Sequence, residues 1–316
     1  MSAKELSIAI LTGGDSDERG ISLLSGDGVY NALKETNHTI QIIDPSIKSD
    51  LAKLISEDID IAFIALHGKG GEDGKIQGFL ESIGLPYTGS GVLASAVAMN
   101  KITTKIIYKE AGLITPDYVV YKETEENFIK ETKERLSFPC VLKAATEGSA
   151  IGVYIVHAED ELIPALNRAK MLSNYIFAEK YITGKEYTVA VLGEDSCEAL
   201  PVIAINASNE FYDYEAKYTK GRSTHICPAD ISEGLTRLLK DIALHAHKAL
   251  GCYGVSRSDF IVDEHENVYI IETNTIPGMT ETSLLPEAAQ EHGLSFTQLC
   301  EKMIELALRK NAKEEN

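Results

Sequence analysis

Apolar and polar residues alternate in blocks along the first hundred residues of the chain. Short apolar runs predict strands at Ser7–Leu11, Thr39–Ile43 and 59–65. Amphipathic stretches predict helices near 22–34, 50–57 and 75–83. This order is typical of a parallel sheet with helices on its faces. In open sheets of this kind, ligands bind at the carboxyl ends of the strands.

Two glycine-rich turns, 12–22 and 67–74, would lie at those strand ends. Glycines permit close approach of the backbone, and the N-terminus of a following helix favours an anionic group. Neither turn has the G-x-G-x-x-G pattern of a dinucleotide site. Taken singly, each turn is as readily structural as functional.

A second region begins near residue 97, with a helix predicted over 100–112. Farther on, two apolar strands flank a loop of small residues, and Lys143 lies near the end of the first strand. The N–H groups of such a loop suit phosphates, and the lysine would neutralise their charge. The alternative is a lysine that reaches solvent from a strand end. The apolar neighbours of Lys143 favour the functional interpretation.

Two carboxylates, Glu179 and Glu186, flank a predicted turn between strands. An adenine and a ribose need acceptors of this kind, while Tyr181 and Ile182 offer a flat apolar wall. On spacing alone, a charged turn between two strands explains these residues better. The stretch 211–225 is polar, aromatic and without a period, which is typical of an ordered functional loop. A helix is predicted over 232–251, ending at a glycine cap.

The segments around 254–262 and 268–280 each carry polar side chains two residues apart in an apolar strand pattern. A hairpin centred between His265 and Glu266 would place Asp259 opposite Glu272, and Arg257 opposite Asn274. Oxygen ligands of this kind suit magnesium that bridges substrate phosphates, and an arginine beside them stabilises developing negative charge. For any one of these residues alone, a structural ion pair is the better explanation, but four on one face favour a site.

Composition narrows the functional classes. The 316 residues carry a formal charge of −18, which argues against nucleic acid and against an anionic membrane surface. The five cysteines are scattered without a C-x-x-C pair, so neither disulfides nor a zinc site is indicated. No apolar run is long enough to span a bilayer, and the N-terminus lacks the pattern of a secretory signal. We therefore expect a cytoplasmic protein of two or three domains.

Eight motifs in a fixed order resemble the D-alanine:D-alanine ligase family of ATP-grasp enzymes along nearly the whole chain. They are Gly13 to Gly26, His67 to Gly78, Pro86 to Gly91, Met99 to Lys101, Lys143 to Ser149, 211–218, Arg257 to Asp259, and Glu272 to Leu284. The resemblance implies an α/β fold with an N-terminal doubly wound parallel-sheet domain and two α+β domains that clasp ATP. The implied domain limits are 1–97 for the N-terminal domain on the first-substrate side, 98–185 for the central ATP-grasp domain and 186–316 for the C-terminal catalytic domain.

The resemblance also implies roles for individual residues. Magnesium, at two sites and replaceable by manganese, would be held by Asp259, Glu272 and Asn274. The residues implied around ATP are Lys101, Lys143 and Lys217 on its phosphates and Glu179, Tyr181, Ile182 and Glu186 around adenosine. The residues implied for substrate and catalysis are Glu18 on the first ammonium group, His67 beside it, Ser149 and Tyr218 in a network with Glu18, Arg257 and the Gly278 N–H on the oxyanion, and Ser283 and Leu284 on the second carboxylate.

The implied reaction phosphorylates the carboxylate of one D-alanine with ATP, after which the amine of a second attacks the acyl phosphate, for peptidoglycan precursor synthesis. Rival hypotheses are a ligase that joins D-alanine to D-lactate, D-serine or another amino acid, and a non-catalytic ATP-binding relative. Tyr218 favours the dipeptide, and the presence of Arg257, Asp259 and Glu272 argues against loss of catalysis. The family also implies a homodimer through the N-terminal domain.

Three positions depart from the family pattern. Gly20 stands where a glutamate is usual, Ala150 replaces a serine, and Thr282 replaces a common histidine. The alanine removes a hydroxyl near the phosphates but keeps its backbone N–H, so we expect weakened rather than absent ATP binding. Thr282 leaves the preference for the second substrate open.

Overall fold

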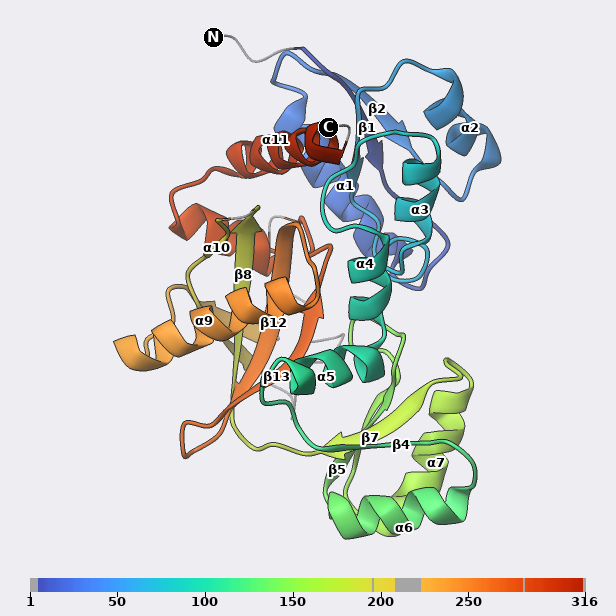
Figure 1. Ribbon diagram of the computed structural model, residues 1–316, viewed down its shortest axis with the longest axis vertical. Helices are drawn as coiled ribbons and strands as arrows, with labels where there is room; N and C mark the ends of the chain where they lie inside the picture. The colour runs from blue at the N-terminus through green and yellow to red at the C-terminus, as the bar shows by residue number, and fades with distance from the viewer. Residues whose placement is uncertain (1–4, 195, 208–222, 281, 315–316) are drawn as a thin grey trace.

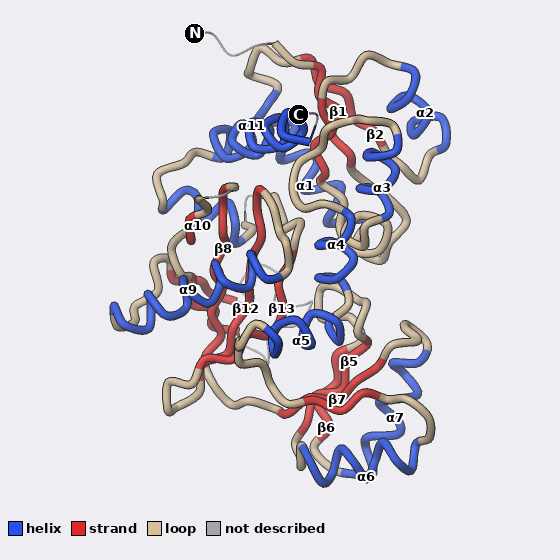
Figure 2. The backbone as a smooth tube through the Cα atoms, in the orientation of Figure 1, coloured by secondary structure: helices blue, strands red, loops and turns tan. Residues whose placement is uncertain are grey.

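The computed structural model describes residues 5–194, 196–207, 223–280 and 282–314. Within these residues the chain forms three β-sheets, each with its own helices (Figure 1, Figure 2). The first and last described elements, β1 and α11, lie at the same end of the molecule (Figure 1).

The N-terminal sheet is parallel, with strand order β2-β1-β3. Its strands are β1 (Ser7–Leu11), β2 (Thr39–Ile43) and β3 (Ile61–Ile64), and its helices are α1 (Arg19–Leu33), α2 (Lys48–Ser56) and α3 (Lys75–Ser82). Successive residues of β1 enter different cores: Ile8 and Ile10 pack on the α1 side, while Ala9 and Leu11 pack on the side of α2 and α3. Burial on both faces explains the continuous apolar runs. The strands and helices predicted for this region are confirmed.

The middle sheet is antiparallel, with order β4-β7-β5-β6, and lies at the opposite end of the molecule (Figure 1). Its strands are β4 (Tyr118–Val120), β5 (Cys140–Ala144), β6 (Val153–Val156) and β7 (Ile176–Lys180). The helices α6 (Glu125–Arg135) and α7 (Glu159–Lys170) pack on it and share its core. The loop between β5 and β6 is the small-residue loop that the sequence predicts after Lys143.

The third sheet has the order β11-β10-β8-β12-β13, with β9 paired to β8. Its strands are β8 (Lys185–Gly193), β9 (Glu198–Ala199), β10 (Ile203–Ala207), β11 (Ser223–Ile226), β12 (Gly254–Val262) and β13 (Val268–Asn274). The other helices of the described residues are α4 (Val92–Met99), α5 (Lys101–Glu110), α9 (Glu233–Ala249), α10 (Leu284–Glu291) and α11 (Phe296–Glu314). The side chain of Ser232 caps α9 at its N-terminus, and Gly251 follows it with φ +68°, so the predicted glycine cap is confirmed.

The β12–β13 hairpin has the predicted register at the site: Arg257 faces Asn274 and Asp259 faces Glu272. Beyond Asp259 the register shifts by one residue, and Phe260 pairs with Ile270. This bulge lies next to the predicted ligands, as bulges near active sites often do. The predicted pairing is therefore confirmed for residues 257–259, which carry the site, and is wrong by one residue for 260–262, beside the turn.

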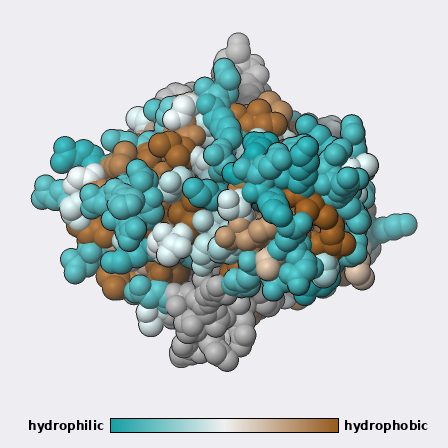
Figure 3. Space-filling model, turned by 90° about the horizontal axis from the view of Figure 1, so that it is seen from below, coloured by the Kyte–Doolittle hydropathy of each residue, from teal (hydrophilic) through white to brown (hydrophobic). Residues whose placement is uncertain are grey.

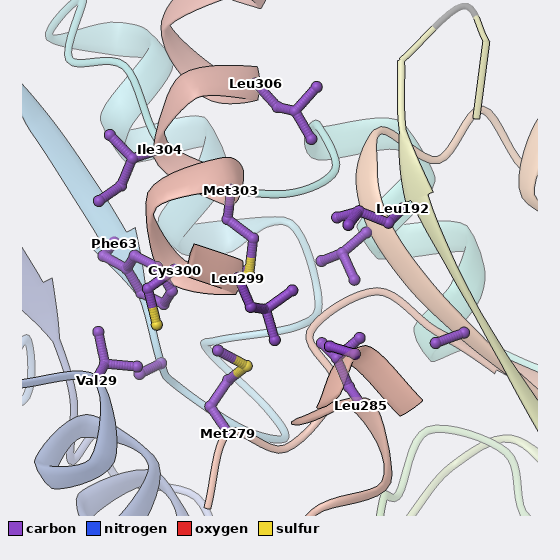
Figure 4. Close-up of a cluster of buried hydrophobic side chains, with 14 of the residues drawn as sticks. Val29, Phe63, Leu192, Met279, Leu285, Leu299, Cys300, Met303, Ile304 and Leu306 are labelled. Atoms are coloured by element: carbon purple, nitrogen blue, oxygen red, sulfur yellow. The ribbon is translucent and has the colours of Figure 1, made fainter. Parts of the chain in front are cut away.

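The hydrophobic cores cross the predicted domain limits. Tyr108 and Leu113 pack with α9 and the third sheet, and α11 packs against α1 beside the N-terminal sheet. Figure 4 shows Leu299, Cys300 and Met303 of α11 together with Val29, Phe63 and Leu192. The limits 1–97, 98–185 and 186–316 remain a prediction.

The surface beside α6 and α7, seen in Figure 3, is largely hydrophilic, with hydrophobic side chains in separate patches among the polar ones. Among the described residues, no helix combines the length and apolar character that crossing a membrane requires.

Candidate active site

Two adjoining cavities lie where the three sheets meet. The first is lined by residues of the N-terminal turns, the β5–β6 loop and the segment after β13, and the second lies between the middle and third sheets. Lys101, Glu147 and Glu272 line both. The second cavity holds about 380 Å³, within the range of small-molecule sites.

Every predicted site residue that the structure describes lines one of these two cavities. The first is lined by Glu18, His67, Lys101, Ser149, Arg257, Glu272, Asn274, Gly278, Ser283 and Leu284. The second is lined by Lys101, Lys143, Glu179, Tyr181, Ile182, Glu186, Asp259 and Glu272. Lys217 and Tyr218 lie outside the described residues. The roles assigned to these residues stay predictions.

Glu18 connects the N-terminal sheet to the β5–β6 loop. It is 6% exposed, immediately precedes α1, and accepts a hydrogen bond from the Ser149 hydroxyl. The loop approaches so closely that a Cβ on Gly148 would collide with the Glu18 carboxylate. Gly68, with φ +70°, leaves only 2.6 Å between an added Cβ and the same carboxylate. The buried carboxylate is thus enclosed by two glycine positions at which an added Cβ would collide with it.

His67 is buried beside this carboxylate. Its Nε2 lies 2.8 Å from the Ser25 hydroxyl, and its Nδ1 lies 3.5 Å from Glu72. The backbone N–H of Met279 also donates to the Ser25 hydroxyl, at 3.2 Å. Helix α1 therefore connects the turn after β3 with the loop after β13, which places His67 and Gly278 at the same cavity.

The hairpin supplies paired charges at the junction of the cavities. Arg257 donates two hydrogen bonds to Asp259, each 2.9 Å long, and the Thr188 hydroxyl donates to the same carboxylate at 2.6 Å. Glu272 forms an ion pair with Lys101, with 3.1 Å between Oε2 and Nζ. The bidentate pair fixes the orientation of Asp259, and each of the two carboxylates has a cationic partner.

Lys101 begins α5, whose N-terminus is capped by the Asn100 side chain. Its ammonium donates to the carbonyl of Glu147 at 2.8 Å, and its amide donates to the carbonyl of Ala145. Burial alone would lower the pKa of Lys101, but Glu272, with smaller contributions from Glu18 and Glu72, raises it above its ordinary value. The lysine stays protonated and provides a fixed positive charge between the cavities.

Glu179 lies at the far end of the second cavity, 3% exposed, between two lysines. Lys143 pairs with one carboxylate oxygen, and Lys105 lies 2.8 Å from the other. Burial would raise the pKa of Glu179, but the two lysines together hold it below its ordinary value. The carboxylate is therefore ionised and accepts hydrogen bonds without donating any.

Ser283 and Leu284 begin α10 at the other side of the first cavity. The Ser283 hydroxyl accepts from the N–H of Thr280 at 3.0 Å and lies 2.7 Å from the Thr280 hydroxyl. A Cβ on Gly278 would lie 2.8 Å from the same hydroxyl. Gly278 and Ser283 are thereby held in one compact turn that faces the cavity.

The three departures from the family pattern occupy different surroundings. Gly20 is exposed in the first turn of α1, with no atom near the position of a Cβ. Ala150 lines the second cavity and, like Ser149, has a positive φ, at 60°. Thr282 lines the first cavity. The last two therefore lie where a ligand would meet them.

Sequence reasoning does not single out Glu147, Glu72 or Lys105 as site residues. Glu147 is 7% exposed and pairs with Lys69 of the turn after β3, which fastens the β5–β6 loop to the N-terminal turns. Lys105 is one helical turn beyond Lys101, on the buried face of α5. That spacing of two lysines is the signal that could have found Lys105.

The predicted metal ligands suit magnesium by the chemistry of their oxygens. Asp259 and Glu272 face each other across the hairpin, and Asn274 lies two residues after Glu272. The side-chain amide oxygen of Asn274 accepts a hydrogen bond from the N–H of Ile276 at 2.9 Å. Over the described part of the chain, no three His, Cys, Asp or Glu residues gather as a metal site. Two carboxylates and an amide fit magnesium, which is commonly bound by one or two carboxylates and by substrate phosphates.

Two antiparallel sheets that meet at a cavity with lysines and paired carboxylates, preceded by a parallel-sheet domain, define the ATP-grasp class. Comparison with known families narrows the class. The model of the D-ala D-ala ligase C-terminus matches residues 107–305, and that of the D-ala D-ala ligase N-terminus matches residues 44–90. The chain belongs to the D-alanine–D-alanine ligase family.

Individual relatives agree with this assignment. The chain is 47% identical to the D-alanine–D-alanine ligase of Syntrophobacter fumaroxidans, over 98% of this chain and 99% of that one. Its fold is similar to that of the Bacillus anthracis ligase complexed with ATP, with a TM-score of 0.85 and 34% identity over 98% and 99% of the two chains. A D-Ala:D-Ser ligase of Enterococcus faecalis has a TM-score of 0.83 and 30% identity, over 96% of this chain and 100% of that one.

Proposed function

We propose that this protein joins two molecules of D-alanine to D-alanyl-D-alanine, with conversion of ATP to ADP and phosphate, for peptidoglycan precursor synthesis. The observation that carries the proposal is the junction of the two cavities at Lys101, Glu147 and Glu272. A nucleotide in one cavity and a small amino acid in the other would meet there, which is what transfer of a phosphoryl group between them requires.

The first cavity suits two small zwitterions. Glu18 would hold the ammonium group of the first D-alanine, with His67 beside it. Ser283 and Leu284 would hold the carboxylate of the second. Ser149 and Tyr218 would complete a network with Glu18 that closes the β5–β6 loop over the site, which is supported by the hydrogen bond between Ser149 and Glu18.

The second cavity suits ATP. Lys101, Lys143 and Lys217 would neutralise its phosphates. The residues proposed around adenosine are Glu179, Tyr181, Ile182 and Glu186. Asp259, Glu272 and Asn274 would hold two magnesium ions, for which manganese substitutes. When bound, the metal withdraws negative charge from the phosphoryl oxygens.

A carboxylate becomes electrophilic only when one of its oxygens is converted to a leaving group. A carboxylate oxygen of the first D-alanine therefore attacks the γ-phosphorus, and ADP leaves. The amine of the second D-alanine then attacks the carbonyl carbon of D-alanyl phosphate, and inorganic phosphate leaves. Arg257 and the N–H of Gly278 would stabilise the oxyanion that forms in this second step.

Several further features belong to the proposal. The protein would act in the cytoplasm as a homodimer formed through its N-terminal domain, without nucleic-acid or membrane partners. The charge of −18 supports the absence of nucleic acid from its partners.

The test is phosphate release from ATP and magnesium with D-alanine, L-alanine, or D-alanine plus D-serine or D-lactate, with products identified by mass. We expect D-alanyl-D-alanine as the dominant product. Arg257→Ala should abolish it, whereas Arg135→Ala, on the exposed face of α6, should leave it unchanged. ATP binding without turnover of any D-amino acid would refute the proposal, and a dominant mixed product would identify the related ligase.

A further inference from the structure

Lys105 is a fully buried lysine next to the second cavity. It is 1% exposed, among the largest side chains buried to that degree. Lysine is almost never fully buried without a partner, and burial lowers its pKa despite an opposing contribution from Glu179. The buried ammonium group of Lys105 therefore needs partners that offset the cost of its burial.

The ammonium of Lys105 has three polar partners. It donates to the Thr115 hydroxyl at 2.7 Å and to the carbonyl of Pro116 at 3.3 Å, and lies 2.8 Å from Glu179. The rings of Tyr118 and Phe177 enclose it, with centroids 5.6 and 6.0 Å away. Two hydrogen bonds and one ion pair surround the ammonium, and the side chain is 1% exposed, so Lys105 does not contact a ligand in the cavity itself.

Lys143 shares Glu179 with Lys105 but is placed differently. Lys143 lines the second cavity, whereas Lys105 is not among the described residues that line it. Two ammonium groups face one carboxylate, so the charge of Glu179 is balanced by either lysine alone. Lys143 is thus free to turn towards an anionic ligand, while Lys105 stays on Glu179.

We propose that Lys105 is a positioning residue for nucleotide binding: it is the permanent partner that keeps Glu179 an acceptor and releases Lys143 for the phosphates. The proposal rests on the proposed use of ATP. Without Lys105, movement of Lys143 towards the phosphates would leave a buried carboxylate unpaired, which is strongly unfavourable. The carboxylate would then take up a proton.

A change in the protonation of Glu179 alters which purine it prefers. An ionised carboxylate accepts from the 6-amino group of adenine and repels a 6-oxo group. A neutral carboxyl group has an O–H, with which it donates to a 6-oxo group, and it still accepts from a 6-amino group through its other oxygen. Lys105 therefore acts on the choice between ATP and ITP, which differ in this 6-substituent and in the proton that hypoxanthine carries on the adjacent N1.

A purely structural role is the competing explanation. Helix α5 shares a core with the third sheet through Tyr108, while Tyr118 and Phe177 belong to the middle sheet. Lys105 thus also connects two sheets, and its loss could loosen the cavity between them. Loosening would weaken ATP and ITP alike, whereas a changed Glu179 would weaken ATP selectively.

The experiment compares Lys105→Met with Lys109→Met on the full-length protein. Lys109 lies one turn farther along α5, half-exposed, and its ammonium is 4.8 Å from the same Tyr118 ring. We measure kcat/KM for ATP and for ITP with D-alanine. Lys105→Met should lower the ATP-to-ITP ratio about tenfold, the value of one hydrogen bond to a charged group. Lys109→Met should leave the ratio unchanged.

An unchanged ATP-to-ITP ratio in Lys105→Met would overturn the proposal, whether kcat/KM falls equally for both nucleotides or for neither. If Lys105→Met does not fold, the comparison is made between Glu179→Gln and the double variant Lys105→Met/Glu179→Gln, which removes the buried charges of Lys105 and Glu179. Because Lys105 acts through Glu179, the double variant should keep the ratio of Glu179→Gln. A further fall in the ratio would show an independent role and overturn the proposal.

Failure of this inference is distinguishable from failure of the proposed function. If the unaltered protein makes no D-alanyl-D-alanine, the proposed function fails. The inference is then tested by the dissociation constants of ATP and ITP, measured by calorimetry on the same variants. A selective loss of ATP affinity in Lys105→Met supports it, and an equal or absent loss overturns it.

Discussion

Single glycine positions control how closely the β5–β6 loop approaches Glu18. Gly148 does not have a positive φ, so alanine suits its backbone, but a Cβ there would meet the Glu18 carboxylate. Gly20, two residues after Glu18, has open space where a Cβ would be. The same substitution at these two positions should therefore have opposite consequences.

Gly148→Ala should lower kcat/KM for D-alanine about a hundredfold, because displacing a substrate-binding group by roughly 1 Å has effects of that size. The kinetics are measured at saturating ATP, with circular dichroism to verify the fold. Wild-type kinetics in this variant would show that the loop yields without moving Glu18.

Gly20→Ala should stabilise the protein by about 0.5–1 kcal/mol, because alanine restricts the unfolded chain and favours the helix. Urea unfolding measures the change, and activity should be unaltered. A loss of activity would reveal a functional need for glycine where the family usually has glutamate.

At the scale of elements, a buried histidine connects α9 with β12. His247 is 2% exposed, and its Nδ1 lies 2.7 Å from the hydroxyl of Ser256, the neighbour of Arg257. Burial, with a smaller contribution from Lys248, lowers the pKa of His247 to about 4. The helix that supports the hairpin thus packs through a neutral imidazole.

The stability of the protein should therefore depend on the protonation of His247. An unfolded histidine titrates near pH 6.5, so the unfolded state binds the proton first as the pH falls. The stabilising contribution is complete above about pH 6.5 and is lost as the pH falls towards 4. Between pH 7 and pH 5 the loss is about 2 kcal/mol.

His247→Gln should remove this part of the pH dependence, measured as the free energy of unfolding in urea at pH 7 and pH 5. His245→Gln, on the exposed face of the same helix, is the matched control and should behave as the wild type. An unchanged pH dependence in His247→Gln would show that folding does not shift the pKa of His247.

At the scale of the whole molecule, one core joins the two ends of the chain. Leu299 of α11 is 0% exposed and packs in a cluster that includes Val29 of α1, Phe63 of β3 and Leu192 of the third sheet (Figure 4). The first cavity lies between these same parts of the chain, so its geometry depends on this packing.

Leu299→Ala should destabilise the protein by about 3 kcal/mol, as deletion of a buried leucine side chain does. Leu93→Ala, at a position 76% exposed, should change stability by less than about 0.5 kcal/mol. Because the chain has no tryptophan, unfolding is followed by circular dichroism and by loss of activity. Two separate transitions in the wild type would show that this core does not couple the sheets.

The sequence predicted elements and local geometry well where a pattern with a fixed period existed. Strands of period two and helices of period 3.6 placed β1, α1, α9 and the hairpin, because backbone geometry fixes which side chains share a face. The register bulge after Asp259 was not predictable from strand periodicity, because a period of two does not indicate where one strand gains an extra residue.

By itself, the sequence determined the class of fold, the pattern that places Arg257, Asp259, Glu272 and Asn274 at the cavities, and the family through its ordered motifs. Only the tertiary structure decided that α11 packs beside the N-terminal sheet, that Glu147 borders both cavities and that Lys105 balances the charge of Glu179. The physical reason is that periodicity reports on neighbours within one element. Burial and charge balance depend on residues far apart in the chain, which meet only when the sheets pack together.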